Sequence, residues 1–283
     1  MKILVTGAKG QLGKCIKDAA ANYPEFDFLF ASRELLNIES EESISNIFKN
    51  YLFDYCINTA AYTNVEKAES NQQTAFLTNA EGVKHLARHC EKNNTTLIQI
   101  STDYVFDGKK GTTYTEEDTT KPLNVYGASK LKGEQYAQEI CQAHYILRTS
   151  WLYSQYGHNF YNTVLRFVKE GKPLTITTEQ TGTPTNAYDL AEAILNIVKS
   201  NSKQYGIYNY SNQGEATWYD FAKEILIQTN QLTKSNLAKT DYYRTFAIRP
   251  SYSVLDTRKY KNTFNKAVFD WKKSLKAFNI KQH

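Results

Sequence analysis

Residues 2–13, KILVTGAKGQLG, predict a β-strand, a glycine-rich turn and the start of a helix. The run from Lys2 to Thr6 is short and apolar, and a helical pattern follows the last glycine to about Ala21. Glycines in such a turn allow the backbone to approach a pyrophosphate closely, and the start of the helix offers free N–H groups and a positive dipole end. This order of elements predicts a dinucleotide site, although the glycine spacing is GxxGxxG rather than GxGxxG.

Strands and helices alternate along the chain to about residue 150. Apolar runs of strand type lie at 28–31, 55–58, 97–100 and 145–148, and helical patterns lie at 72–92 and from Tyr126 onward. This alternation predicts an α/β fold in which residues 1–150 form a Rossmann-type, doubly wound parallel sheet that binds the dinucleotide. We expect residues 151–283 to form mainly a smaller C-terminal substrate-binding lobe, with some segments returning to the main sheet. Its expected helices are 159–169, 188–199, 218–228 and 271–278, and its expected strands are 174–176 and 207–209.

The composition of the chain is typical of a soluble globular protein. Its 283 residues are 41% hydrophobic and 22% charged, and no stretch approaches the length of a membrane span. The four cysteines form no CxxC pair, which argues against a zinc site and a disulfide framework. The first apolar run is too short for a signal peptide. We therefore expect a cytoplasmic protein that contacts neither nucleic acid nor membrane, with a net charge of +5 that reflects solvated basic side chains.

Tyr126 and Lys130 lie four residues apart at the start of a predicted helix, so their side chains share one face of it. A phenol with a pKa near 10 is a poor acid or base at neutral pH, and a neighbouring ammonium lowers that pKa. The pair is therefore a candidate acid/base, although a solvated helical face is an equally simple interpretation of this spacing alone. Ser101 and Thr102 strengthen the first interpretation, because they end a predicted strand where ligands gather in an open parallel sheet.

The cofactor preference is predicted from the end of the second strand. Ser32 and Arg33 follow that strand, where an acidic residue would hold the ribose of NAD, and we expect no carboxylate near the guanidinium. A hydroxyl and a guanidinium suit a 2′-phosphate, so we expect NADPH as cofactor, with NADH possible. A surface arginine with no ligand is the alternative. His85 and His89 lie one helical turn apart but lack the glutamate of HExxH, and we assign no metal site.

Several stretches resemble a known family. TGAKGQLG, Thr102 and YGASK resemble the extended short-chain dehydrogenase/reductase family. A closer resemblance, to the dTDP-4-dehydrorhamnose reductase branch of that family, rests on five stretches that cover nearly the whole chain. They are NTAAYTNVEKAE (58–69), STDYVFDG (101–108), RTSWLY (148–153), TGTPT (181–185) and RPSYSVLDTRK (249–259).

The resemblance implies an NADPH-dependent oxidoreductase that reduces the 4-keto group of dTDP-4-dehydro-L-rhamnose to give dTDP-L-rhamnose. It implies catalytic roles for Thr102, Tyr126 and Lys130. The expected cofactor-binding residues are Gly7, Gly10, Gln11, Leu12, Gly13, Ser32, Arg33, Ala60, Ala61, Tyr62, Asn79, Tyr126 and Lys130. The expected substrate-binding residues, toward a dTDP-sugar, are Asn64, Val65, Tyr104, Trp151 and Arg249.

Two positions depart from the pattern of the family. Asn37-Ile38 stands where an aspartate is expected, which puts the contact with adenine in doubt. Cys15 stands where some members carry a glutamate that belongs to a magnesium-linked dimer contact. We therefore expect no metal, and a monomer or weak homodimer.

Two other functions remain open. One is another nucleotide-sugar epimerase or dehydratase of the same fold, which would keep its cofactor oxidised. Dehydratases commonly show Asp-Glu after the threonine that ends the strand, whereas here Thr102 is followed by Asp103-Tyr104. The other is a non-catalytic regulatory subunit that binds the cofactor as a structural element. The presence of both Tyr126 and Lys130 disfavours it.

Overall fold

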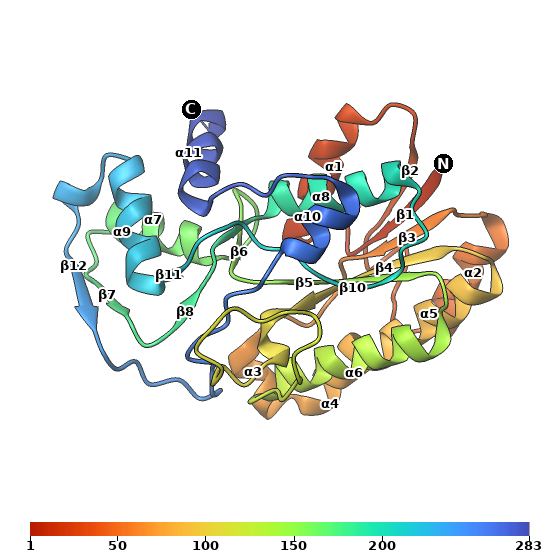
Figure 1. The fold of residues 1–283 in the computed structure, drawn as a ribbon, viewed down its shortest axis with the longest axis horizontal. Helices are drawn as coiled ribbons and strands as arrows, with labels where there is room; N and C mark the ends of the chain where they lie inside the picture. The colour runs from red at the N-terminus through yellow and green to blue at the C-terminus, as the bar shows by residue number, and fades with distance from the viewer. Residues whose placement is uncertain (283) are drawn as a thin grey trace.

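The computed structural model describes residues 1–282, and their side chains as far as Ile280. Its centre is a parallel sheet of six strands in the order β10-β5-β4-β3-β1-β2 (Figure 1). The chain passes from β1 to β2 in one direction and through β3, β4 and β5 in the other, so the order reverses between β1 and β3. Ligands bind at the carboxyl ends of the strands beside such a reversal. The strands are β1 (Lys2–Thr6), β2 (Asp27–Ala31), β3 (Tyr55–Asn58), β4 (Thr96–Thr102), β5 (His144–Thr149) and β10 (Gly206–Asn209).

Helices cover both faces of this sheet, which confirms the doubly wound fold (Figure 1). Side chains of β1 alternate between the faces: Ile3 and Val5 belong to one apolar core and Leu4 to the other. The first core includes α1 (Gln11–Ala19), α8 (Ala187–Ser200) and α10 (Arg258–Phe264). The second includes α2 (Glu41–Asn50), α5 (Gly82–Lys92) and α6 (Val125–Ile140).

A smaller lobe lies beside the sheet, with a separate apolar core that includes Tyr153, Phe221 and Trp271 (Figure 1). Its strands form three two-stranded pairings: β7 with β12, β8 with β11, and β6 with β9. The helices are α7 (Phe160–Lys169), α9 (Trp218–Gln228) and α11 (Trp271–Gln282). The strands are β6 (Leu152–Tyr153), β7 (Leu174–Thr177), β8 (Thr181–Gly182), β9 (Thr185–Asn186), β11 (Ala216–Thr217) and β12 (Leu237–Thr240).

Parts of the second half of the chain join the main sheet. Strand β10 pairs with β5, and α8 packs against α1. Within the described residues, no helix is long and apolar enough to span a membrane.

Some helix boundaries differ from the sequence prediction. The first helix ends at Ala19 and continues only as a 3-10 turn over Ala20–Asn22. The helix predicted over 72–92 is α4 (Gln72–Phe76), a π-helical turn (Leu77–Glu81) and α5. The short helix α3 (Val65–Ser70), together with α2 and α10, was not predicted.

Candidate active site

The glycine-rich turn after β1 is closely packed against the end of β3. Gly7 has a φ of +65°, and a Cβ atom on it would lie 2.7 Å from the backbone nitrogen of Ala60. A Cβ on Gly13 would lie 2.6 Å from the carbonyl oxygen of Gly7. The N-cap of α1 is Gly10, and no side chain caps the helix. Positions 7 and 13 therefore require glycine, and the first turn of α1 lies open to a phosphate.

A cavity of about 330 Å³ lies at this turn. Its walls come from the ends of β1, β2 and β3, which is the point where the strand order reverses. The lining residues are Gly7, Lys9, Gly10, Arg33, Glu34, Leu36, Asn37, Ile38, Glu39, Thr59, Ala60, Ala61 and Thr78. The cavity and the glycine cradle fit a dinucleotide, with Asn37 and Ile38 at the wall in place of the expected aspartate.

Arg33 is at this cavity, but the expectation of no nearby carboxylate was wrong. Its guanidinium lies 2.7 Å from the carboxylate of Glu39, which also accepts a hydrogen bond from the Thr78 hydroxyl at 2.6 Å. Lys9 forms a second ion pair at the cavity, 3.0 Å from Glu34. The Arg33 side chain is 72% exposed, so it can turn toward a ligand. A 2′-phosphate at this site would therefore compete with two carboxylates, those of Glu34 and Glu39, for the cations of Lys9 and Arg33.

Three of the expected cofactor residues have side chains that are engaged elsewhere. Leu12 is buried in the core beneath α1. The Gln11 side chain accepts a hydrogen bond from Asn159 at 2.8 Å, which joins α1 to the start of α7. The buried Asn79 amide accepts from the N–H of Tyr62 at 2.8 Å and donates to the carbonyl of Tyr62 at 2.9 Å. Asn79 thus holds the segment that follows Ala60 and Ala61 in place.

Tyr126 and Thr102 meet where α6 packs against the end of β4. Asn124 caps α6 by accepting the N–H of Gly127 at 2.8 Å. A Cβ on Gly127 would lie only 2.2 Å from the carbonyl oxygen of Tyr104, so only glycine allows this approach. The Thr102 hydroxyl lies near enough to the Tyr126 phenol to lower the pKa of that phenol. The structure therefore brings together two of the three expected catalytic side chains.

The predicted lowering of the Tyr126 pKa by Lys130 is absent from this structure. Burial raises the pKa of the Tyr126 phenol to about 12, although the nearby Thr102 hydroxyl opposes the rise. The Lys130 ammonium instead donates to the carbonyl oxygen of Ile100 at 2.5 Å, and burial lowers its pKa to about 8. The tyrosine is therefore protonated at neutral pH, and the lysine ammonium is held at the end of β4 by the Ile100 carbonyl.

Buried acidic groups that sequence reasoning missed support this site. Glu134, one turn after Lys130 on α6, forms a buried ion pair with Arg148 at 2.7 Å and accepts a hydrogen bond from the Ser101 hydroxyl. The spacing of four residues between Lys130 and Glu134 on one helix was the sequence signal that could have identified Glu134. Asp103 accepts from Ser253 at 2.6 Å and from Thr102 at 3.1 Å, and burial raises its pKa to about 7.

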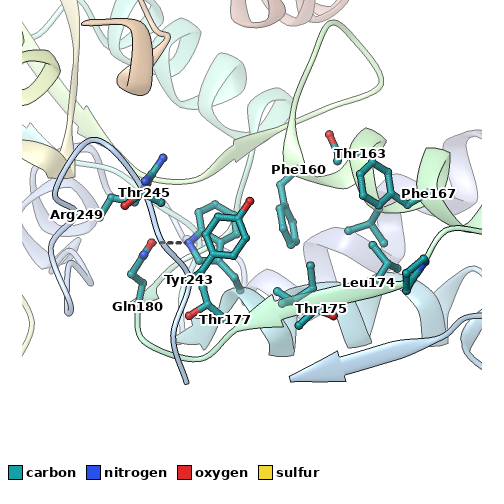
Figure 2. Close-up of a pocket in the computed structure, with 14 residues that line it drawn as sticks. Phe160, Thr163, Phe167, Leu174, Thr175, Thr177, Gln180, Tyr243, Thr245 and Arg249 are labelled. Carbon is teal, nitrogen blue, oxygen red and sulfur yellow. Dashed lines mark hydrogen bonds between the residues drawn. The ribbon is translucent and has the colours of Figure 1, made fainter. Parts of the chain in front are cut away.

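A second cavity, of about 500 Å³, lies in the smaller lobe (Figure 2). Figure 2 shows Phe160, Phe167 and Leu174 toward one end, and Gln180, Thr245 and Arg249 toward the other. The remaining lining residues are Thr163, Val164, Pro173, Thr175, Ile176, Thr177, Trp218 and Tyr243. The cavity therefore has an apolar, aromatic end and a polar, cationic end.

Trp151 packs against Trp218, a residue of the cavity wall. Its ring stacks on that of Trp218, with 3.6 Å between centroids and an angle of 6° between planes. Gly182 packs against the Trp151 ring as well, since a Cβ atom on Gly182 would lie 2.6 Å from Cε2 of that ring. Trp218 in turn donates from Nε1 to Gln180 at 2.9 Å. The sequence analysis named Trp151, which stacks on Trp218 without lining the cavity, and did not single out Trp218, which lines it.

The other expected substrate residues lie on three different segments. The buried ring of Tyr104 meets the Tyr126 ring edge-on at 5.9 Å, and Arg249 lies near enough to lower the pKa of the Tyr104 hydroxyl, against the larger, raising effect of burial. Asn64 caps α3 by accepting the N–H of Lys67 at 2.9 Å, and Val65 is the first residue of that helix. Tyr104 therefore lies near both the candidate acid and Arg249, which belongs to the cavity wall.

A doubly wound sheet with a glycine cradle, and a Tyr-x-x-x-Lys helix packed against a strand-end threonine, defines an extended short-chain dehydrogenase/reductase. The chain belongs to the family described as RmlD substrate binding domain, whose model matches residues 1–282.

Relatives with established names are similar over nearly their full length. The dTDP-4-dehydrorhamnose reductase of Aggregatibacter actinomycetemcomitans is 34% identical, with 97% of each chain covered. The enzyme of the same name from Escherichia coli strain K12 is 35% identical, with 98% of this chain and 96% of the relative covered. Among solved structures, dTDP-4-dehydrorhamnose reductase from Bacillus anthracis in complex with NADP has a TM-score of 0.94 at 33% identity, with 99% of each chain covered.

Proposed function

We propose that this protein is an NADPH-dependent oxidoreductase that reduces the 4-keto group of dTDP-4-dehydro-L-rhamnose to dTDP-L-rhamnose. The observation on which this rests is the buried, protonated Tyr126 at the end of β4, whose ring meets that of Tyr104 at 5.9 Å, together with a cavity that has one cationic end. A reduction needs a proton donor at the carbonyl oxygen, and a phenol with a raised pKa is in the donor form. The relatives named as dTDP-4-dehydrorhamnose reductases support the same reaction.

The glycine cradle and the first cavity would hold the cofactor, with Lys9 and Arg33 toward its 2′-phosphate. The reduced nicotinamide of that cofactor, extending from the cradle toward Tyr126, would supply a hydride to the carbonyl carbon. Tyr126 donates its phenolic proton to the carbonyl oxygen as charge develops on it, which leaves a phenolate. Thr102, whose hydroxyl donates to Asp103 at 3.1 Å in this structure, would turn that donor to the same oxygen, and the new bond would strengthen as the charge grows. Lys130, one helical turn after Tyr126 and bonded here to the Ile100 carbonyl, would stabilise the phenolate with its charge until solvent returns the proton.

We place the nucleotide of the substrate in the second cavity. The aromatic end, with Phe160 and Trp218, suits a flat base, and Arg249 suits the diphosphate. This orientation directs the sugar toward Tyr104 and Tyr126, because Arg249 lies near Tyr104 and the two tyrosine rings meet edge-on.

The direct test is a spectrophotometric assay with NADPH and dTDP-4-dehydro-L-rhamnose. We expect substrate-dependent loss of NADPH absorbance and formation of one equivalent of dTDP-L-rhamnose. Conversion of a nucleotide sugar without added reduced cofactor would indicate an epimerase or a dehydratase. Tight binding of NADPH with no turnover of any 4-keto sugar would indicate a regulatory subunit. Either result would refute the proposal.

Arg33→Ala is expected to weaken NADPH binding by about three- to tenfold and to leave NADH binding nearly unchanged, because an exposed guanidinium contributes modestly to binding of a phosphate. Glu39→Gln is the matched variant. It removes the carboxylate that pairs with Arg33 and should strengthen NADPH binding. Dissociation constants for both cofactors, from fluorescence titration, test this. Equal losses for NADPH and NADH in Arg33→Ala would show that Arg33 does not bind the 2′-phosphate.

Magnesium removal is expected to leave activity unchanged, with the protein a monomer or weak homodimer. Cys15 is fully buried, and burial raises the pKa of its thiol to about 12, so it offers no ligand to a hard cation. Asp189 and Glu192 on α8 could replace it, but Asp189 accepts from Asn212 at 2.7 Å and Glu192 from Tyr23 at 2.8 Å. Activity and light scattering before and after EDTA test this. Loss of activity or of a dimer that magnesium restores would contradict it.

A further inference from the structure

The segment that supplies Arg249 crosses from the smaller lobe to the sheet domain as an exposed strap, residues 241–249. Tyr243, Thr245 and Arg249 from this strap line the second cavity. The strap has little apolar burial: Tyr243 is 57% and Phe246 is 74% exposed. Its position therefore depends on polar contacts at its backbone and at Arg249.

Glu66, on the short helix α3, makes three of these contacts with one carboxylate. One oxygen accepts the N–H groups of Phe246 at 2.8 Å and Ala247 at 3.3 Å. The other lies 2.5 Å from the guanidinium of Arg249. Burial favours the neutral acid, but the Phe246 N–H and the Arg249 charge outweigh it and hold the pKa of Glu66 below its usual value. The carboxylate is therefore ionised at neutral pH.

Other contacts hold the strap at its two ends. The carboxylate of Glu179 accepts the N–H of Tyr243 at 3.2 Å, on the side of the smaller lobe. Asn124, which caps the helix of Tyr126, donates to the carbonyl oxygen of Ile248 at 2.7 Å. Between them, Glu66 is the charged partner of Arg249, whose side chain is only 19% exposed and also donates to the Ala247 carbonyl at 3.4 Å.

We propose that Glu66 is a positioning residue for nucleotide-sugar binding, which fixes the strap and aims Arg249 at the diphosphate. This inference rests on the proposed function, because it takes the second cavity as the nucleotide site. The Glu66 charge opposes that of Arg249 and by itself would weaken attraction to a phosphate. Positioning outweighs this effect, since an unanchored strap and guanidinium must be ordered each time the ligand binds.

The test compares Glu66→Ala and Glu66→Gln with the wild type. Alanine removes both the backbone contacts and the charge, whereas glutamine keeps an oxygen that accepts the two N–H groups. We expect the Kd for dTDP, measured by calorimetry, to rise at least tenfold in Glu66→Ala and less in Glu66→Gln. The KM for the nucleotide sugar should rise in parallel, while kcat stays within about threefold of the wild type.

Two controls separate positioning from general damage. Ser70→Ala alters the same helix at a side chain that bonds only to the helix backbone at Lys67, and it should leave dTDP affinity unchanged. The Kd for NADPH should stay within twofold in every variant, which shows that the sheet domain is folded.

Three outcomes would overturn the proposal. These are unchanged dTDP affinity in Glu66→Ala, tighter dTDP binding in Glu66→Gln, or a fall in kcat as large as the fall in kcat/KM. The proposed reaction fails separately, if the wild type binds dTDP but does not oxidise NADPH with the keto sugar. In that case the Kd values still decide the role of Glu66. A wild type that binds no dTDP would overturn both.

Discussion

Replacement of Tyr126 by phenylalanine is expected to lower kcat by roughly 10²–10⁴-fold, the usual contribution of a general acid. The change removes one oxygen and leaves the ring, so the edge-on contact with Tyr104 at 5.9 Å remains. The Thr102 hydroxyl stays held, because it accepts the N–H of Tyr104 at 3.2 Å. Steady-state rates with NADPH and the keto sugar measure the effect.

The cofactor and substrate affinities of Tyr126→Phe provide the control. The Kd values for NADPH and dTDP should stay within about twofold of the wild type, since neither cavity is lined by Tyr126. A variant that turns over at the wild-type rate would exclude Tyr126 as the acid. Water or Asp103, the buried carboxyl beside Thr102, would then have to donate the proton.

Gly127→Ala is expected to lower kcat by about 10²-fold, because it moves the helix that carries Tyr126 and Lys130. On an unobstructed helix, this change would stabilise the protein by about 1 kcal/mol. Here the new Cβ would lie 2.2 Å from the Tyr104 carbonyl and 3.1 Å from Pro122, so α6 must retreat from the strand-end turn. Misplacement of a catalytic group by about 1 Å can cost 10²-fold in rate.

The effect of Gly127→Ala is measured by kcat together with the melting temperature. Gly157→Ala is the matched control: it adds the same methyl group at a positive φ of +70°, but no atom lies within 4 Å of the new Cβ. It should lose some stability through backbone strain and keep its kcat. A Gly127→Ala variant that is more stable than the wild type and fully active would show that the helix does not depend on this close approach.

Patterns within about a dozen residues predicted most of the main sheet. The strand predicted at 28–31 is β2 at 27–31, and the one predicted at 55–58 is β3 with the same bounds. The glycines at 7 and 13 were also identified, because their spacing reports a turn that only glycine can make. The family resemblance is likewise a property of short, ordered motifs, and the family match confirms it.

Short elements were predicted poorly. The helices α3 and α10 span six and seven residues, too few to show a clear period. The two-residue strands of the smaller lobe, such as β8 and β11, are recognisable only once their partner lies beside them. Where these short helices and strands form depends on tertiary packing rather than on the local conformational preference of their residues.

The amino-acid pattern alone was enough for the positions of the strands of the first half and for placing Tyr126 and Lys130 on one helix, because both follow from backbone periodicity. The order of the strands in the sheet came only from the tertiary structure. The sequence pattern did not predict which groups the charged side chains contact. Glu66 meets Arg249, Arg33 meets Glu39, and Lys130 turns to the carbonyl of Ile100 rather than to the phenol. Each choice depends on which groups are brought within a few ångströms by packing of distant segments, and on how much water remains there to stabilise a charge.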